Sequence, residues 1–117
     1  MKCIGIDIGG TFIKAGVVDN KGNIIKKEQI PTRGEEGKRE VVLSQIENAI
    51  DFCFKGEDKK EIKGIGIGTP GLVDNNGIVY EAPNLPGWDN LPLREIIEKK
   101  YNIKTIVEND VNTIAWG

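Results

Sequence analysis

The chain has 117 residues, 38% of them hydrophobic and 29% charged, with a formal net charge of -2. This composition is ordinary for a soluble globular domain and lacks the basic footprint of a nucleic-acid-binding protein. No apolar run approaches the roughly 18 residues of a membrane span, and no signal-peptide pattern opens the chain, so we expect a cytoplasmic protein without membrane or nucleic-acid partners.

Histidine is absent and only two cysteines occur, Cys3 and Cys53. The absence of histidine excludes Ser-His and Cys-His nucleophilic schemes, and two cysteines argue against a structural zinc site. Both cysteines lie in apolar segments, and we expect them to be reduced, buried thiols.

The first thirty residues predict three consecutive antiparallel strands. Lys2–Ile8 and Phe12–Val18 flank a Gly9-Gly10 turn, and Ile24–Ile30 follows and ends at a proline. Glycine favours such a turn because it adopts positive φ at little cost.

The rest of the chain alternates helices with strands. In order, we predict an amphipathic helix over Glu40–Phe54, a buried strand over Ile62–Thr69, a hairpin over Leu72–Tyr80, a proline-broken loop, a helix from Pro92 to Tyr101, a strand over Lys104–Val107 and a helix from Asp110 onward. Strand–helix–strand steps imply parallel pairing of the later strands. The predicted fold is an α/β domain with a mixed sheet and helices on both faces.

The turn between the first two strands carries polar side chains suited to a phosphate. With no Cβ atoms at Gly9 and Gly10, backbone N–H groups can approach a phosphate closely. Thr11 and Lys14 could meet phosphate oxygens, and Asp7 could face a Mg²⁺-bound water. The alternative is an ordinary hairpin whose polar residues face solvent.

Gly66–Gly71 matches the G-x-G-x-x-G string of dinucleotide-binding proteins. That motif should open a helix, whereas here Pro70 and a predicted hairpin follow, so no helix dipole would face a pyrophosphate. We therefore interpret the match as chance.

Glu108-Asn109-Asp110 stands at the end of the last predicted strand. Ligands of open α/β sheets collect beyond the carboxyl ends of strands. A carboxylate such as Asp110 could accept a proton from a substrate hydroxyl there, and Asn109 could orient that substrate. Asp110 could instead simply cap the following helix, and the two roles can coexist.

Four segments, taken together, resemble the ROK family of bacterial sugar kinases and related repressors. They are Ile6–Lys14, Gly66–Asp74, Pro83-Asn84-Leu85 with Trp88, and Glu108–Asn112. Their order matches the family across essentially the whole chain. The resemblance implies the actin-like, ribonuclease-H-like ATPase fold and, as the activity, ATP-dependent phosphorylation of a hexose, glucose foremost.

The resemblance also implies roles for individual positions. Gly9, Gly10, Thr11 and Lys14 would contact ATP phosphates, and Asp7 would act through Mg²⁺ or its water shell.

On the sugar side, Gly71 would bring backbone close to the hexose and Asn84 would line the same pocket. Asn109 would hydrogen-bond sugar hydroxyls, and Asp110 would be the general base.

ROK kinases run to about two domains of this size. Their second half adds further sugar-binding acids, a histidine, a zinc site and much of the adenosine pocket. We therefore expect this chain to be the N-terminal lobe of such a kinase, inactive alone, with zinc only in the other lobe and the full-length protein a homo-oligomer.

Two other functions remain open. A sugar-sensing ROK repressor would carry a DNA-binding segment before the first phosphate motif, whereas here the first strand starts at Lys2. Another actin-like ATPase would share the opening strands but not the Pro83–Leu85 and Glu108–Asp110 signals. The identity of the hexose is also open.

Overall fold

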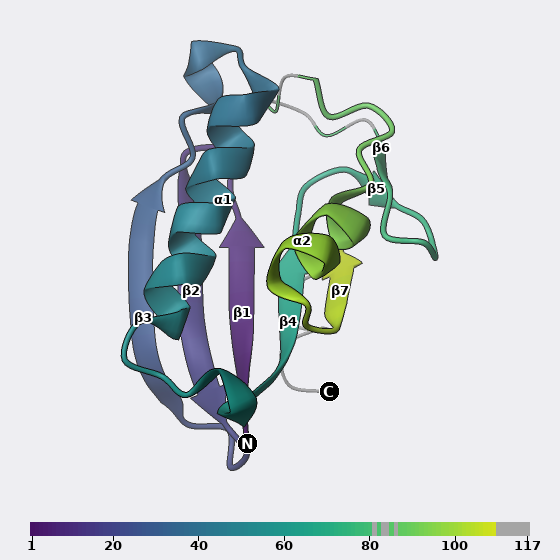
Figure 1. Ribbon diagram of the computed structural model, residues 1–117. Coiled ribbons are helices and arrows are strands. Elements are labelled where there is room, and N and C mark those ends of the chain that lie inside the picture. Colours follow the sequence, from purple (N-terminus) through teal and green to yellow (C-terminus); the bar gives the residue numbers. More distant parts are fainter. Residues whose placement is uncertain (81, 83–84, 86, 110–117) are drawn as a thin grey trace.

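The computed structural model describes residues 1–80, 82, 85 and 87–109. A five-stranded mixed sheet runs through it in the order β3-β2-β1-β4-β7 (Figure 1). Its strands are β1 (Lys2–Ile8), β2 (Phe12–Asp19), β3 (Ile24–Pro31), β4 (Ile62–Gly68) and β7 (Thr105–Glu108). Strand β2 is antiparallel to both β1 and β3, and β1, β4 and β7 are parallel.

Two helices and a small hairpin complete the described structure. The helices are α1 (Arg39–Phe54) and α2 (Leu93–Tyr101), and the hairpin joins β5 (Leu72–Val73) to β6 (Val79–Tyr80). Single 3-10 turns, η1 (Gly34–Glu36) and η2 (Lys59–Glu61), flank α1. Each element predicted before Asp110 is therefore present in the described residues, with its ends shifted by one residue or so.

Both described helices cover the same face of the sheet (Figure 1). The crossover from β3 to β4 carries α1, and the crossover from β4 to β7 carries α2. Both steps move across the sheet in the same direction, and right-handed crossovers then place their helices on one side. The helix predicted from Asp110 lies outside the described residues, so cover on the second face stays a prediction.

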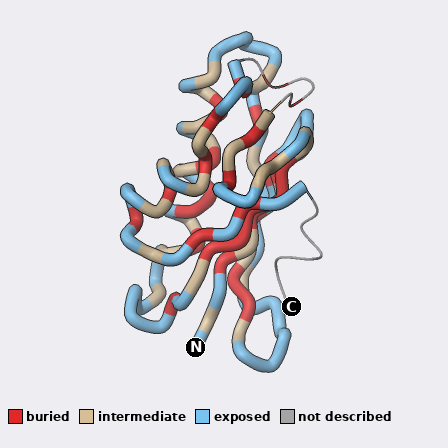
Figure 2. The backbone as a smooth tube through the Cα atoms, turned by 90° about the vertical axis from the view of Figure 1, so that its right-hand side faces the viewer, coloured by how far each residue is buried: buried red, intermediate tan, exposed pale blue. Residues whose placement is uncertain are grey.

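Alternation along the strands separates the two faces of the sheet. Ile4, Ile6 and Ile8 of β1 are buried beneath the helices, whereas Cys3 and Asp7 point to the opposite side. Figure 2 shows the buried segments concentrated along the middle of the sheet. Cys3 is exposed, which corrects the prediction that both cysteines are buried; the apolar composition of its strand did not reveal which face it occupies.

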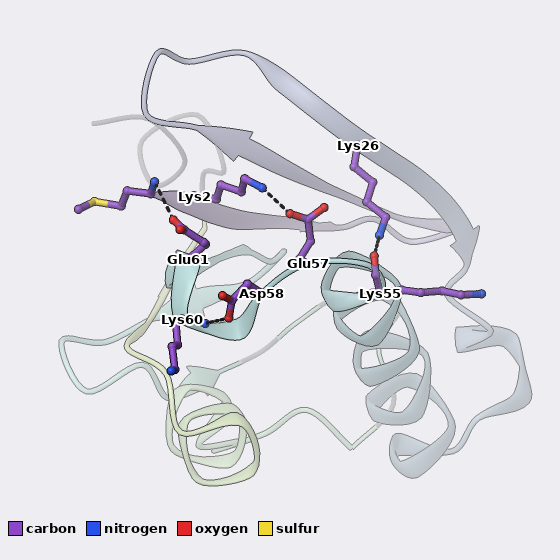
Figure 3. A network of polar contacts seen from close by, with 8 residues as sticks. Lys2, Lys26, Lys55, Glu57, Asp58, Lys60 and Glu61 are labelled. Carbon is purple, nitrogen blue, oxygen red and sulfur yellow. Dashed lines mark hydrogen bonds and ion pairs between the residues drawn. The ribbon is translucent and has the colours of Figure 1, made fainter.

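The amino-terminal end of β1 is fastened by ion pairs (Figure 3). The Lys2 ammonium lies 2.6 Å from the Glu57 carboxylate, and the amino group of Met1 lies 3.2 Å from that of Glu61. Lys26, on the edge strand β3, donates a hydrogen bond to the Lys55 carbonyl at the end of α1. These exposed or partly exposed contacts lie where β1 begins. The candidate site lies at the opposite end of the sheet, where β1, β4 and β7 end.

The different environments of the two cysteines predict different reactivity. Cys53 is fully buried in α1, and burial raises the pKa of its thiol to about 11, so at pH 8 only about one molecule in a thousand carries the reactive thiolate. Ellman's reagent should therefore label only Cys3 in the native protein, and Cys53 only after denaturation. Cys3→Ser should remove the native signal, and rapid native labelling of Cys53 would contradict this packing.

Candidate functional site

Three strand ends meet at one edge of the sheet. Because β1, β4 and β7 are parallel, the residues that follow them, Gly9, Thr69 and Asn109, emerge side by side. The Thr69 N–H donates to the Glu108 carbonyl at 2.9 Å and ties the second of these ends to the third. This is the edge at which ligands of open α/β sheets collect.

A row of polar residues and one glycine crosses the sheet just below this edge. Asp7 pairs with Lys14 on β2 and with Gly68 on β4, and Gly68 pairs with Glu108 on β7. Directly paired residues point to the same face. Asp7 and Glu108 therefore lie on one face with a single strand between them, about 10 Å apart by ordinary strand spacing.

Asp7 and Lys14 share a cavity on the face without described helices. The cavity measures about 560 Å³ and is lined also by Gly5 and Gly16, which pair across β1 and β2. These glycines leave space above the sheet because they have no side chain. Asp7, predicted to act through Mg²⁺, therefore lies beside Lys14, predicted to contact phosphate. Asp7 is half-buried and Lys14 is exposed.

The Gly9-Gly10 turn has a different basis from the predicted one. Neither glycine has positive φ, so conformational freedom does not explain the pair. A Cβ on Gly9 would stand 2.8 Å from the Phe12 carbonyl, which accepts the Gly9 N–H at 2.9 Å. A Cβ on Gly10 would meet nothing within 4 Å. Gly9 is needed for a close backbone approach, and Gly10 leaves open space outside the turn.

Gly71 is explained by packing within the chain. Its φ is +95°, and a Cβ there would stand 2.8 Å from both the Ala82 Cα and the Tyr80 carbonyl oxygen. Only glycine fits such an approach in this conformation. The predicted contact with a hexose, which would use the backbone of Gly71, stays a prediction.

Asp74 organises the hairpin that follows Gly71. Its carboxylate accepts the N–H groups of Ile78 and Asn76 and the Tyr80 hydroxyl, and these hydrogen bonds, the one from Ile78 first, lower the pKa of Asp74. The hairpin borders a second cavity of about 400 Å³, lined by residues of β5 and β7 and by Asn109.

The structure thus brings seven of the nine predicted site residues to one edge. They are Asp7, Gly9, Gly10, Thr11 and Lys14 on the first hairpin, Gly71 after β4 and Asn109 after β7. Asn84 and Asp110 lie outside the described residues.

Sequence reasoning missed two residues at this edge. In the sequence Glu108 is only a neighbour of Asn109, whereas the strand register aligns it with Asp7. Thr32 follows β3 and is completely buried, with its hydroxyl on the Gly9 carbonyl. A lone threonine after Pro31 gives no pattern in the sequence, because its partner lies 23 positions earlier.

The described residues fit Mg²⁺ bound jointly with phosphate better than a preformed metal cage. Among them, no three His, Cys, Asp or Glu side chains gather into a metal site. Asp7 offers a single carboxylate beside open space, and Mg²⁺ often uses one or two carboxylates together with phosphate oxygens and water. No described helix is long and apolar enough to cross a membrane.

The ROK family model matches residues 3–117. A glucokinase of Thermotoga maritima is 38% identical over 118 residues, covering 100% of this chain and 36% of that protein. A xylose repressor of Caldicellulosiruptor bescii is 36% identical over 117 residues, covering 97% and 29%. The crystal structure of a ROK family glucokinase from Streptomyces griseus, in complex with glucose and AMPPNP, matches with a TM-score of 0.82 at 35% identity, covering 96% and 34%.

These likenesses confirm the predicted fold class, the actin-like ATPase fold with its mixed sheet. The chain spans about a third of the length of the curated relatives it matches. Those relatives are therefore nearly three times as long as this chain, which corrects the expectation of about two domains of this size.

The two turn glycines predict a contrast in stability. Gly9→Ala forces a Cβ against the Phe12 carbonyl and should lower the free energy of unfolding by about 2 kcal/mol. Gly10→Ala is the matched control and should change it by less than about 0.5 kcal/mol, because its Cβ meets open space. Urea denaturation measures both values, and equal losses would mean that the turn is built differently.

Proposed function

The chain belongs to the ROK family, and from that premise we propose that it forms the phosphate-binding lobe of an ATP-dependent hexose kinase, converting glucose to glucose 6-phosphate in the cytoplasm. The observation that carries this proposal is the convergence of the Asp7–Lys14 hairpin and Asn109 at one edge of the sheet. A kinase needs its phosphate donor and its hydroxyl acceptor at such a junction.

On the phosphate side, we assign the triphosphate to the Gly9–Thr11 turn. Open space beside Gly10 allows oxygen atoms to approach the backbone, and Thr11 is exposed. Lys14 would add a positive charge from the neighbouring strand. Asp7 would hold Mg²⁺ directly or through its water shell, and the bound ion would neutralise charge on the phosphate oxygens.

On the sugar side, we assign Asn109, Asn84 and the backbone of Gly71 to the hexose. The cavity that Asn109 helps to line, about 400 Å³, is within the range of small-molecule sites. Asp110, the next residue, would act as general base.

In the proposed reaction, the sugar hydroxyl gives its proton to the Asp110 carboxylate as its oxygen bonds to the γ-phosphorus. The bond from that phosphorus to the β–γ bridging oxygen breaks, and ADP leaves with the electron pair. Positioning and charge stabilisation supply most of the catalysis in such transfers.

We further propose that this chain is the N-terminal lobe and is inactive alone. Its relatives are about three times as long, so two thirds of their length has no counterpart here. That remainder would supply further sugar contacts, the adenosine pocket, the zinc site and the contacts of a homo-oligomer.

A sugar-sensing regulator is the alternative, because a xylose repressor is also among the relatives. A regulator would bind sugar without turnover. The Gly9–Thr11 turn and Lys14 favour the kinase, since a sensor has no need of a phosphate site.

A chimera tests the proposal. Residues 1–117 should replace the corresponding third of the Thermotoga maritima glucokinase, which is 38% identical, and retain ATP-dependent glucose phosphorylation in a coupled assay. In this chimera, Asp110→Asn should lower kcat by about a hundredfold or more because the proton acceptor is lost.

Asp58→Asn is the matched control. Asp58 is exposed and accepts the Lys60 N–H, which asparagine can also accept, so activity should be unchanged. A folded chimera that binds glucose without turnover would favour the regulator, and full turnover with Asp110→Asn would remove Asp110 as the base.

A further inference from the structure

Thr32 is a buried polar residue that joins β3 to the Gly9–Thr11 turn. It follows the last residue of β3, and its exposed fraction is 0%. Its hydroxyl donates to the Gly9 carbonyl at 2.8 Å, and its backbone N–H donates to the Thr11 carbonyl, also at 2.8 Å. Thr32 therefore donates hydrogen bonds to two carbonyls of the turn, although it follows β3, which is not part of the β1–β2 hairpin.

The two hydrogen bonds differ in what they demand of the residue. The backbone N–H bond continues the pairing of β2 with β3, and any residue except proline could make it. The hydroxyl bond requires threonine or serine. Because it is buried, its loss would leave the Gly9 carbonyl without this donor.

The hydroxyl bond also sets the direction of the next N–H group. A peptide unit is planar and trans, so its C=O and N–H point opposite ways. With the Gly9 carbonyl held inward on Thr32, the Gly10 N–H is directed away from Thr32. A Cβ on Gly10 would meet nothing within 4 Å, so the turn is open at this residue.

We propose that Thr32 is a positioning residue for phosphate binding: its hydroxyl holds the Gly9–Gly10 peptide so that the Gly10 N–H faces the triphosphate. This rests on the proposed function, in which that turn receives ATP. Thr32 itself touches no phosphate and acts through the peptide. A donor fixed before the ligand arrives loses no freedom on binding, which strengthens the interaction.

The test is an NMR titration of the isotopically labelled 117-residue chain, with Mg²⁺·ATP and separately with Mg²⁺ and inorganic tripolyphosphate. The amide signals of Gly9, Gly10 and Thr11 report binding. Thr32→Val removes the hydroxyl at nearly constant shape and should weaken binding about tenfold. Thr32→Ser keeps the hydroxyl and should bind within about twofold of the original chain.

Thr105→Val is the matched control. Thr105 is also buried, and its hydroxyl also donates to a backbone carbonyl, that of Ile103, at 3.0 Å. It should lower the urea midpoint as Thr32→Val does, yet leave phosphate affinity unchanged. Thr32→Ala against Thr32→Ser repeats the comparison with small side chains, should the valine variant lose its dispersed amide signals.

The outcomes separate the two proposals. Unchanged affinity in Thr32→Val or Thr32→Ala, with a saturable response in the original chain, would overturn the role of Thr32 alone. Weakening in Thr32→Ser equal to that in Thr32→Ala would assign the effect to packing of the methyl group and would also overturn it. No response of the turn in the original chain, to either probe, would overturn the proposed phosphate site itself.

Discussion

The in-register parallel alignment of β1, β4 and β7 is the constraint on which the rest of the structure depends. Ile4 and Ile6 pair with Ile65 and Ile67, and these isoleucines are buried beneath the helices. A slip of one residue would turn this row toward the opposite face, so hydrophobic burial fixes the register. The same register brings Asp7, Gly68 and Glu108 to one level and sends three strand ends to one edge. The apolar core thereby positions the polar site.

Glycine serves this site in three physically distinct ways. Gly9 allows the backbone of the turn to close on Phe12, and Gly10 leaves room outside it. Gly71 has a positive φ and packs against Ala82, which fixes where the second hairpin leaves β4. Close contacts explain why Gly9 and Gly71 must be glycines, whereas no contact among the described residues explains Gly10. The proposed phosphate contact therefore uses the open space beside Gly10. Thr32 then supplies rigidity that glycines cannot provide.

Local sequence patterns predicted the elements well because turn residues separate one element from the next. Alternation in Lys2–Ile8 and the apolar stripe of α1 gave elements that match within a residue or so. The face of Cys3, the role of Thr32 and the alignment of Glu108 with Asp7 depend on partners distant in sequence, which no local pattern encodes. The hairpin residues and Asn109 are predicted as site residues from resemblance and spacing, and their roles, like those of Asn84 and Asp110, stay predictions.

In the proposed site, the first hairpin binds the triphosphate and Asn109, at the end of β7, lies close to it on the sugar side. Paramagnetic broadening by Mn²⁺·ATP in the labelled chain tests this arrangement directly. We expect selective broadening of the Gly10, Thr11 and Asn109 amides. The turn after β2, Asn20–Asn23, should show no broadening because it lies at the far end of the sheet, about 25 Å away by strand rise. A sharp Asn109 signal beside a broadened hairpin, or equal broadening at Asn20–Asn23, would contradict it.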